Sequence, residues 1–285
     1  MKVVKPCILI MAAFVCSVSS FAAKAMSSFT MQKYQDFTEC RAQASKSTDY
    51  NAIIESYGKF EKEILAQLPA HATDLEQEKL FWESCVRLAK FEYIFNIKAD
   101  IKQERLALKS QMERNEKYIS AHRKKDGVAP LFYMITGDTT SCYMSFSVAS
   151  AMFHGMRVRT LYETSAESGA NMWAANLGLG QWMFYAPGIL GGSMKKAEKH
   201  FLAAIKASVT DAEKFYTYTY YAQFLFERGK KDDAMAYMQK ADSLYPGSNY
   251  IARIKKLNAN GTGLFTYNRE HSGVDSNTDP DAKDL

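Results

Sequence analysis

Apolar residues recur at three- and four-residue spacing along almost the whole chain beyond residue 28. This spacing predicts amphipathic helices, because residues three and four apart share one face of an α-helix. The alternation of apolar and polar residues that is typical of strands is almost absent. The pattern therefore predicts an all-α protein with about eleven helices, near 29–46, 50–67, 74–97, 100–122, 128–151, 153–168, 170–186, 193–208, 211–228, 231–244 and 248–258.

Several predicted helices begin at a residue that can cap them. Asp74, Ser193 and Asp211 each stand directly before an amphipathic stretch. A side-chain oxygen at this position accepts a hydrogen bond from a free backbone N–H of the first turn. We therefore expect helices to begin at these three residues.

Two predicted helix pairs share a packing register. In the segment 215–246, large, small and turn residues stand at fixed spacing, namely Phe215, Tyr218, Tyr221, Ala222, Leu225, Gly229, Ala234, Met238, Ala241 and Pro246. This segment resembles a tetratricopeptide repeat. The segment 170–208 resembles a second repeat, in which Gly192, Ala197, Phe201 and Ala204 reproduce the spacing of the later one and either Gly178 or Gly180 takes the small packing position.

The tetratricopeptide resemblance implies an array of antiparallel helix hairpins wound into a right-handed superhelix. It also implies a concave groove, which the family lines with fixed positions of the first helix of each repeat. Those positions fall on Tyr216, Thr219, Gln223 and Phe226, with Trp173, Gln181, Trp182 and Tyr185 as the neighbouring wall. Aromatic rings beside a hydroxyl and an amide suit a small organic ligand or an extended peptide.

The chain begins with the three parts of a secretory signal peptide. Lys2 and Lys5 precede an apolar run over 7–18, and small residues end in an A-x-A pattern at Ala25. The sequence therefore predicts cleavage after Ala25 and export to the periplasm or beyond the cell. Acylation of Cys16 is an alternative, although a valine precedes it where a small residue is preferred.

The composition argues against several classes of function. Loss of residues 1–25 would remove three lysines and no acid, leaving 33 basic and 31 acidic residues, so we expect no nucleic-acid partner. The glycines at 188–192 lack the GK[ST] of a phosphate-binding loop, although backbone amides near Ser193 could still hold an anion. Hydrolase motifs and metal-ligand spacings are absent from the sequence. We therefore expect no catalytic residues, no metal and no cofactor.

The cysteines leave one question open. Cys40, Cys85 and Cys142 would remain after cleavage. In an oxidising compartment, any two of the three could form a disulfide.

The chain divides into a signal peptide at 1–25, a helical region with degenerate repeats at 26–125, repeats at 126–260 and a disordered tail at 261–285. A second resemblance combines the signal peptide, the irregular first half and a short motif after the long repeat helix. Together they resemble the periplasmic tetratricopeptide T-component of tripartite ATP-independent periplasmic transporters. The residues of the motif are Pro187, Gly191, Gly192, Ala197, Phe201 and Ala204. That resemblance implies a pocket or pore, a solute-binding protein as partner and an accessory role in solute transport. A scaffold or envelope-assembly protein without a small-molecule site, and a homo-oligomer, stay open.

Overall fold

The computed structural model describes residues 25–123, 127–168 and 172–273, and all regular structure in these ranges is helical. The predicted all-α class is confirmed. The helices are α1 Ser28–Ala44, α2 Tyr50–His71, α3 Leu75–Ile94, α4 Ile101–His122, α5 Pro130–Met144, α6 Val148–Ala166, α7 Trp173–Tyr185, α8 Met194–Ala207, α9 Asp211–Glu227, α10 Lys231–Leu244, α11 Asn249–Ala259 and α12 Leu264–Glu270, with short 3₁₀ turns η1 Phe95–Ile97 and η2 Gly188–Leu190. Residues 1–24 lie outside the described ranges, so the signal peptide stays a prediction.

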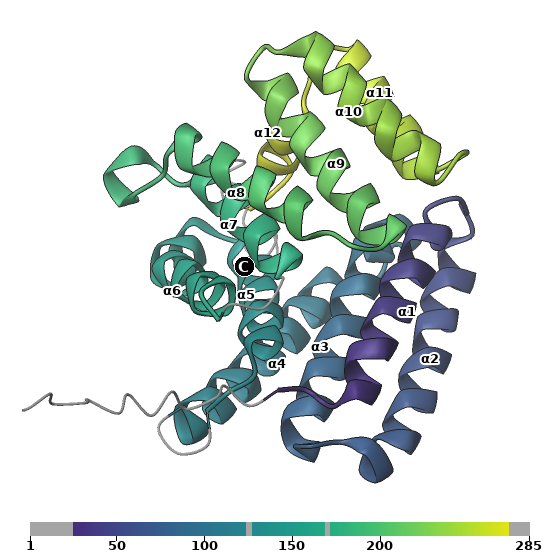
Figure 1. Cartoon of the computed structure of the whole chain (residues 1–285), viewed down its shortest axis with the longest axis vertical. Coiled ribbons are helices and arrows are strands. Elements are labelled where there is room, and N and C mark those ends of the chain that lie inside the picture. Colours follow the sequence, from purple (N-terminus) through teal and green to yellow (C-terminus); the bar gives the residue numbers. More distant parts are fainter. Residues whose placement is uncertain (1–24, 124–126, 169–171, 274–285) are drawn as a thin grey trace, which may run out of the picture.

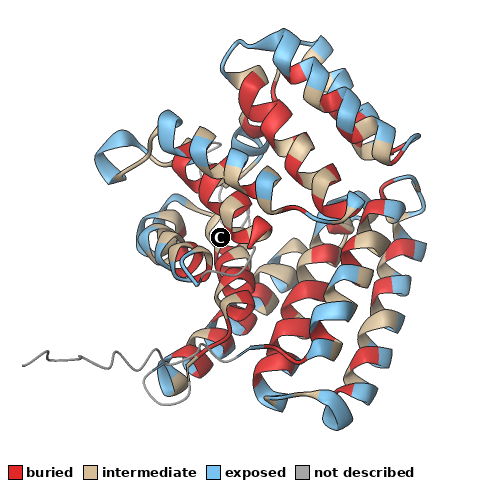
Figure 2. Cartoon of the chain, in the orientation of Figure 1, coloured by how far each residue is buried: buried red, intermediate tan, exposed pale blue. Residues whose placement is uncertain are grey.

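The helices pack against their neighbours in chain order, as in a helical repeat array. The most extensive contacts join α2 with α3, α5 with α6, α7 with α8, and α9 with α10. In Figure 1, α1 to α3 form one block, α9 to α11 form another, and α5 to α8 lie at the side of both. Each helix turns its buried residues toward the next helix, and its exposed residues face outward (Figure 2).

The first helix of the array contacts its last helices. The Ser45 carbonyl oxygen, just after α1, accepts a hydrogen bond from the Asn249 backbone N–H at 2.9 Å, and the Ser45 and Ser248 hydroxyls lie 2.9 Å apart. Ala42 is fully buried in the same apolar cluster as Ala212. The two ends of the array therefore meet, and α1 lies beside the start of α9 (Figure 1).

Caps explain most of the helix starts. The Asp74 and Ser193 side chains accept hydrogen bonds from first-turn N–H groups, as predicted. The prediction for Asp211 was wrong by one residue. Thr210 caps α9 in a reciprocal pair with Glu213, so Asp211 is the first helical residue.

One predicted boundary moved because a cap was overlooked. Residues 128–151 and 153–168 were expected to be separate helices with a break at 152. The break lies instead at 145–147, where Phe146 is buried and the Ser147 hydroxyl accepts a hydrogen bond from the Ser150 N–H.

Part of the predicted tail at 261–285 is ordered. Residues 264–270 form α12, in which Leu264 and Phe265 are buried. The Glu227 carboxylate accepts hydrogen bonds from the Thr266 N–H at 2.8 Å and hydroxyl at 2.7 Å, and thereby fixes α12 to the end of α9. The prediction of disorder is thus wrong for 264–270, and 274–285 lie outside the described residues.

The shared packing register is visible in the burial of its residues. Ala197, Ala204 and Ala241 are completely buried, and Ala234 is nearly so. The choice between the two glycines of α7 is also resolved. A Cβ on Gly180 would lie 2.9 Å from the Phe201 ring of α8, whereas one on Gly178 would meet the Tyr162 ring of α6.

Within the described ranges, the three cysteines Cys40, Cys85 and Cys142 are free thiols. No helix in those ranges combines the length and the apolar character that a membrane span requires.

Candidate functional site

The predicted groove on α9 is covered by α12. Gln223 is buried, and its side-chain oxygen accepts hydrogen bonds from the Leu264 N–H at 2.9 Å and the Asn258 amide at 3.3 Å. Thr219 is also buried and donates its hydroxyl to the Phe215 carbonyl at 2.7 Å. The side-chain oxygens of both residues are used within the fold, and both residues are buried, so neither is exposed to a ligand.

The predicted wall is divided among several contacts. The Tyr185 hydroxyl donates to the Phe265 carbonyl at 3.2 Å. The Trp182 indole donates to the Gly155 carbonyl at 2.8 Å, and Arg159 lies 5.4 Å from its ring. Gln181 and Phe226 are half-buried, and the Lys231 ammonium lies 5.8 Å from the Phe226 ring.

Two predicted residues, Tyr216 and Trp173, meet at another place. Their rings stack with centroids 6.5 Å apart, and the Arg41 guanidinium of α1 lies 5.3 Å from the Tyr216 ring. Arg41 also pairs with the Glu92 carboxylate of α3. Here the end of α1 meets the first half of α9.

We call the group Arg41, Tyr57, Glu92, Tyr93 and Tyr216 the Arg41 cluster. Four helices supply it: α1, α2, α3 and α9. The Tyr57 and Tyr93 rings are 6.4 Å apart. The Arg41 side chain keeps 25% of its surface exposed and that of Glu92 keeps 45%, so solvent reaches the ion pair.

Two polar atoms of the Arg41 cluster lack a normal hydrogen bond among the described residues. The Arg41 Nε atom is buried and has no hydrogen-bond partner among the described residues. The Tyr57 hydroxyl is also buried and, although it lies close to Tyr93, makes no hydrogen bond of normal geometry there. Buried donors without partners are rare in folded proteins because each loses the hydrogen bond that it made to water. The cluster therefore has spare donors.

The surrounding residues fix the protonation states of the Arg41 cluster. Burial opposes the charge on Arg41, but the Glu92 carboxylate and the surrounding tyrosines raise the pKa of Arg41 above its usual value. The guanidinium is accordingly permanently charged. Burial raises the pKa of Tyr93 to about 12 and that of Tyr216 further, so both hydroxyls stay protonated and can donate.

The charges of Glu92 and Arg41 also act on three other half-buried groups. Burial raises the pKa values of Tyr220 and Tyr250, and the Glu92 charge also raises both. Burial likewise raises the pKa of Asp138 to about 6, against the hydrogen bond from Tyr162 and the nearby Arg41 charge. All three side chains still touch solvent. These three groups are partly exposed and yet desolvated enough for their pKa values to be raised.

No protein-family model matches this chain, and no curated protein matches it significantly. What the site can do therefore has to be argued from its own residues. Among the described residues, no group of three His, Cys, Asp or Glu side chains is placed to hold a metal ion.

The glycine-rich turn before α8 was a second candidate for anion binding. The backbone N–H groups of Gly191, Gly192 and Ser193 donate to the carbonyls of Gly188, Pro187 and Met183 at 2.9 to 3.1 Å. These three donors of the turn are already engaged within the chain, and the first amides of α8 are not among them.

Sequence reasoning missed Arg41 and Glu92. No local pattern links α1 with α9, which lies about 170 residues later. The only available signal was a lone arginine within an amphipathic helix, and that spacing is equally common in solvated helices.

Proposed function

We propose that this chain is an exported, tetratricopeptide-like binding protein that holds a small organic carboxylate at the Arg41 cluster. The observation that carries the proposal is the buried Arg41 Nε atom, which has no partner in the described part of the chain although its guanidinium is charged and partly open to solvent. A charged group with a spare, desolvated donor favours an anionic ligand, because charge-assisted hydrogen bonds are stronger than neutral ones.

The arrangement suits a carboxylate better than a phosphate. Glu92 contacts Nη2 of Arg41, the terminal nitrogen beside Nε, which leaves the Nε N–H itself for one oxygen of a further anion. The Glu92 carboxylate lies next to that position and would repel a ligand of higher charge. The Tyr216 ring lies beside the guanidinium, with the buried Trp173 ring stacked on it, and supplies an apolar surface for the rest of the ligand.

The test is calorimetric titration of the full chain with a panel of aliphatic and aromatic monocarboxylates, each paired with its neutral amide. We expect at least one acid to bind and its amide to bind much more weakly. Arg41→Gln should abolish that binding. Arg253→Gln is the matched control, because Arg253 lies at the same 5.3 Å from a tyrosine ring, that of Tyr267, on the exposed face of α11. Equal binding of acid and amide, or full binding by Arg41→Gln, would contradict the proposal.

The role in solute transport rests on the motif at 187–204 and on the predicted signal peptide. If both hold, the ligand is a transported solute and the partner is a solute-binding protein. Cell fractionation tests the export on which this role depends, and recovery of the chain only in the cytoplasm would rule the role out.

A scaffold function is the second candidate, and the outer face of α6 favours it. Val148, Met152, Phe153 and Met156 are exposed there, with 76% exposure at Met152 and 84% at Phe153. Contiguous exposed apolar side chains are typical of surfaces that bind other proteins. A Met152→Ser, Phe153→Ser variant that loses a co-purifying protein while retaining carboxylate binding would favour a scaffold role for this face.

A further inference from the structure

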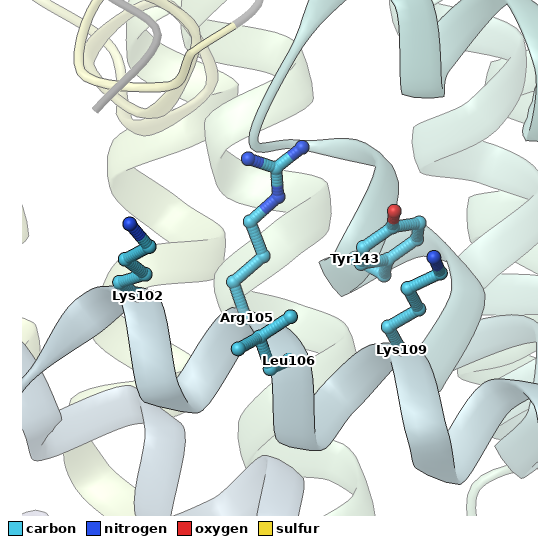
Figure 3. Close-up of a pocket in the computed structure, with 5 residues that line it drawn as sticks. All are labelled: Lys102, Arg105, Leu106, Lys109 and Tyr143. Atoms are coloured by element: carbon cyan, nitrogen blue, oxygen red, sulfur yellow. The ribbon is translucent and has the colours of Figure 1, made fainter. Parts of the chain in front are cut away.

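A basic pocket lies on the outer face of α4, away from the Arg41 cluster. It has a volume of about 220 Å³ and is lined by Lys102, Arg105, Leu106, Lys109 and Tyr143 (Figure 3). The first four residues lie at helical spacing on one face of α4, and Tyr143 faces them from the end of α5. Three positive charges thus surround one depression.

Acids of α4 only partly balance the charges of the two lysines, Lys102 and Lys109. Lys109 has a 3.9 Å contact with Glu113, whose side chain is exposed, and Glu104 of the same helix is shared with Arg87 at 3.9 Å. Like charges three and four residues apart destabilise a helix slightly. The Arg105 guanidinium lies 6.0 Å from the Tyr143 ring and 5.9 Å from the Phe146 ring, which hold it over the pocket. The pocket is therefore suited to an acidic occupant.

The described chain ends beside this pocket. The Gly273 N–H donates to the Ser145 carbonyl at 3.0 Å, and a Cβ at Gly273 would lie 1.8 Å from the Phe146 carbonyl oxygen. Only a glycine allows this approach, so the exit of the chain is fixed against the same loop that supplies Phe146. The segment that follows Gly273 thus begins beside Ser145, the residue before Phe146, whose ring lies near Arg105.

The following sequence, VDSNTDPDAKDL, carries four aspartates, Asp275, Asp279, Asp281 and Asp284, against one lysine. An extended chain covers about 3.3–3.6 Å per residue, which sets an upper limit of about 7 Å on the distance between the Cα atoms of Gly273 and Asp275. Lys102 and Lys109 are about 10 Å apart along α4. The segment is therefore long enough to extend past the spacing of the two lysines.

We propose that residues 274–285 bind the basic pocket of α4 through their aspartates. The occupant is this chain's own acidic segment, selected by its charge and by the fixed exit at Gly273. The contact would also hold down α12, which lies just before the exit and covers Gln223.

The test is zero-length carbodiimide cross-linking of carboxylates to amines in the full chain, read by mass spectrometry. We expect cross-links from Asp275, Asp279 or Asp281 to Lys102 and Lys109. Their yield should fall about tenfold in 1 M salt, because exposed ion pairs are weak and screened. An even spread over exposed lysines such as Lys195 would overturn the proposal.

A charge swap distinguishes the loss of this contact from a loss of folding. Lys102→Glu with Lys109→Glu removes the target amines, and the addition of Asp275→Lys with Asp279→Lys should restore cross-links in the opposite sense. Lys195→Glu, on α8, is the control with a similar change of charge and should leave the original cross-links intact. Failure of the swap to restore them would contradict the proposal. So would cross-links between isotopically labelled and unlabelled chains, because the occupant would then be a second copy.

Discussion

Helix α9 contributes to two polar regions that differ in which buried group lacks a hydrogen-bond partner among the described residues. Beside Gln223 it is an acceptor, the Asn258 Oδ1 atom, and beside Tyr216 it is a donor, the Arg41 Nε atom. In its second half, the Gln223 side-chain oxygen accepts hydrogen bonds from the N–H of Leu264, the first residue of α12, and from the side-chain amide of Asn258 in α11. At its first half, Tyr216 faces an arginine with an unpartnered Nε and a tyrosine hydroxyl without a normal hydrogen bond. Both regions contain polar side chains beside aromatic rings.

This difference assigns a structural role to the Gln223 region and a candidate binding role to the Arg41 cluster. A buried polar group with all its partners inside the chain stabilises one arrangement, and an added ligand would have to displace those partners. A buried donor without a partner loses nothing when a ligand arrives and gains a hydrogen bond. Composition alone does not distinguish the two regions, but the count of satisfied donors does.

The largest expected effect concerns the α12 side. Phe265→Ala removes a fully buried ring that lies 4.9 Å from the Phe184 ring and 6.1 Å from the Phe201 ring. We expect a loss of about 3–5 kcal/mol in the free energy of unfolding, measured by urea denaturation. Phe153→Ala, at an exposed position, should cost less than about 0.5 kcal/mol. A loss below about 1 kcal/mol for Phe265→Ala would show that α12 does not close the groove.

The next effect tests whether Gln223 is structural. Gln223→Leu leaves the Leu264 N–H and the Asn258 amide without their acceptor, which should cost about 1–3 kcal/mol of unfolding free energy. Carboxylate binding should be unchanged. Retained stability together with lost binding would reverse the assignment of the two regions.

Asp138 makes the Arg41 side sensitive to pH. Burial raises its pKa to about 6 in the folded protein, above the value of about 3.9 for an unfolded chain. A raised pKa means that the neutral form is favoured by folding, so this contribution is complete below pH 4 and is lost as the pH rises through 6.

Asp138→Asn should remove that loss. The asparagine can still accept the hydrogen bond from Tyr162, now 2.7 Å long. At pH 8 we expect the variant to be more stable than the wild type by about 1–2 kcal/mol, and at pH 4 to be equal to it. Thermal unfolding at the two pH values measures this, and a constant difference between them would exclude a titrating Asp138.

The smallest expected effect on stability belongs to Arg41. Arg41→Gln removes a partly exposed ion pair and a cation–π contact, which together should cost no more than about 1 kcal/mol. A loss above about 3 kcal/mol in urea denaturation would place Arg41 among the structural residues, with Gln223.

Local patterns predicted the helices and their packing because these depend on neighbouring residues. Ala234 and Ala241 are buried as their spacing required, and Asp74 caps α3. The short helix α12 was missed because only Leu264 and Phe265 are apolar in a stretch that otherwise resembles a tail.

The site was predicted only in part for a related reason. The groove residues were assigned without the helix that covers them, so Gln223 was placed in a groove and lies instead in a core. Tyr216 was named, but its partners Arg41 and Glu92 come from helices that meet α9 only when the array closes. Closure depends on the accumulated curvature of all the hairpins, and no single stretch of sequence encodes it.

The most direct measurement is mass spectrometry of small molecules that remain bound through native purification of the wild type, Arg41→Gln and Arg253→Gln. The proposed function predicts an organic carboxylate in equal amounts with the wild type and Arg253→Gln and its absence from Arg41→Gln. The same molecule bound in equal amounts to all three proteins, or a wild type that neither carries a carboxylate nor binds any acid of the panel, would contradict it.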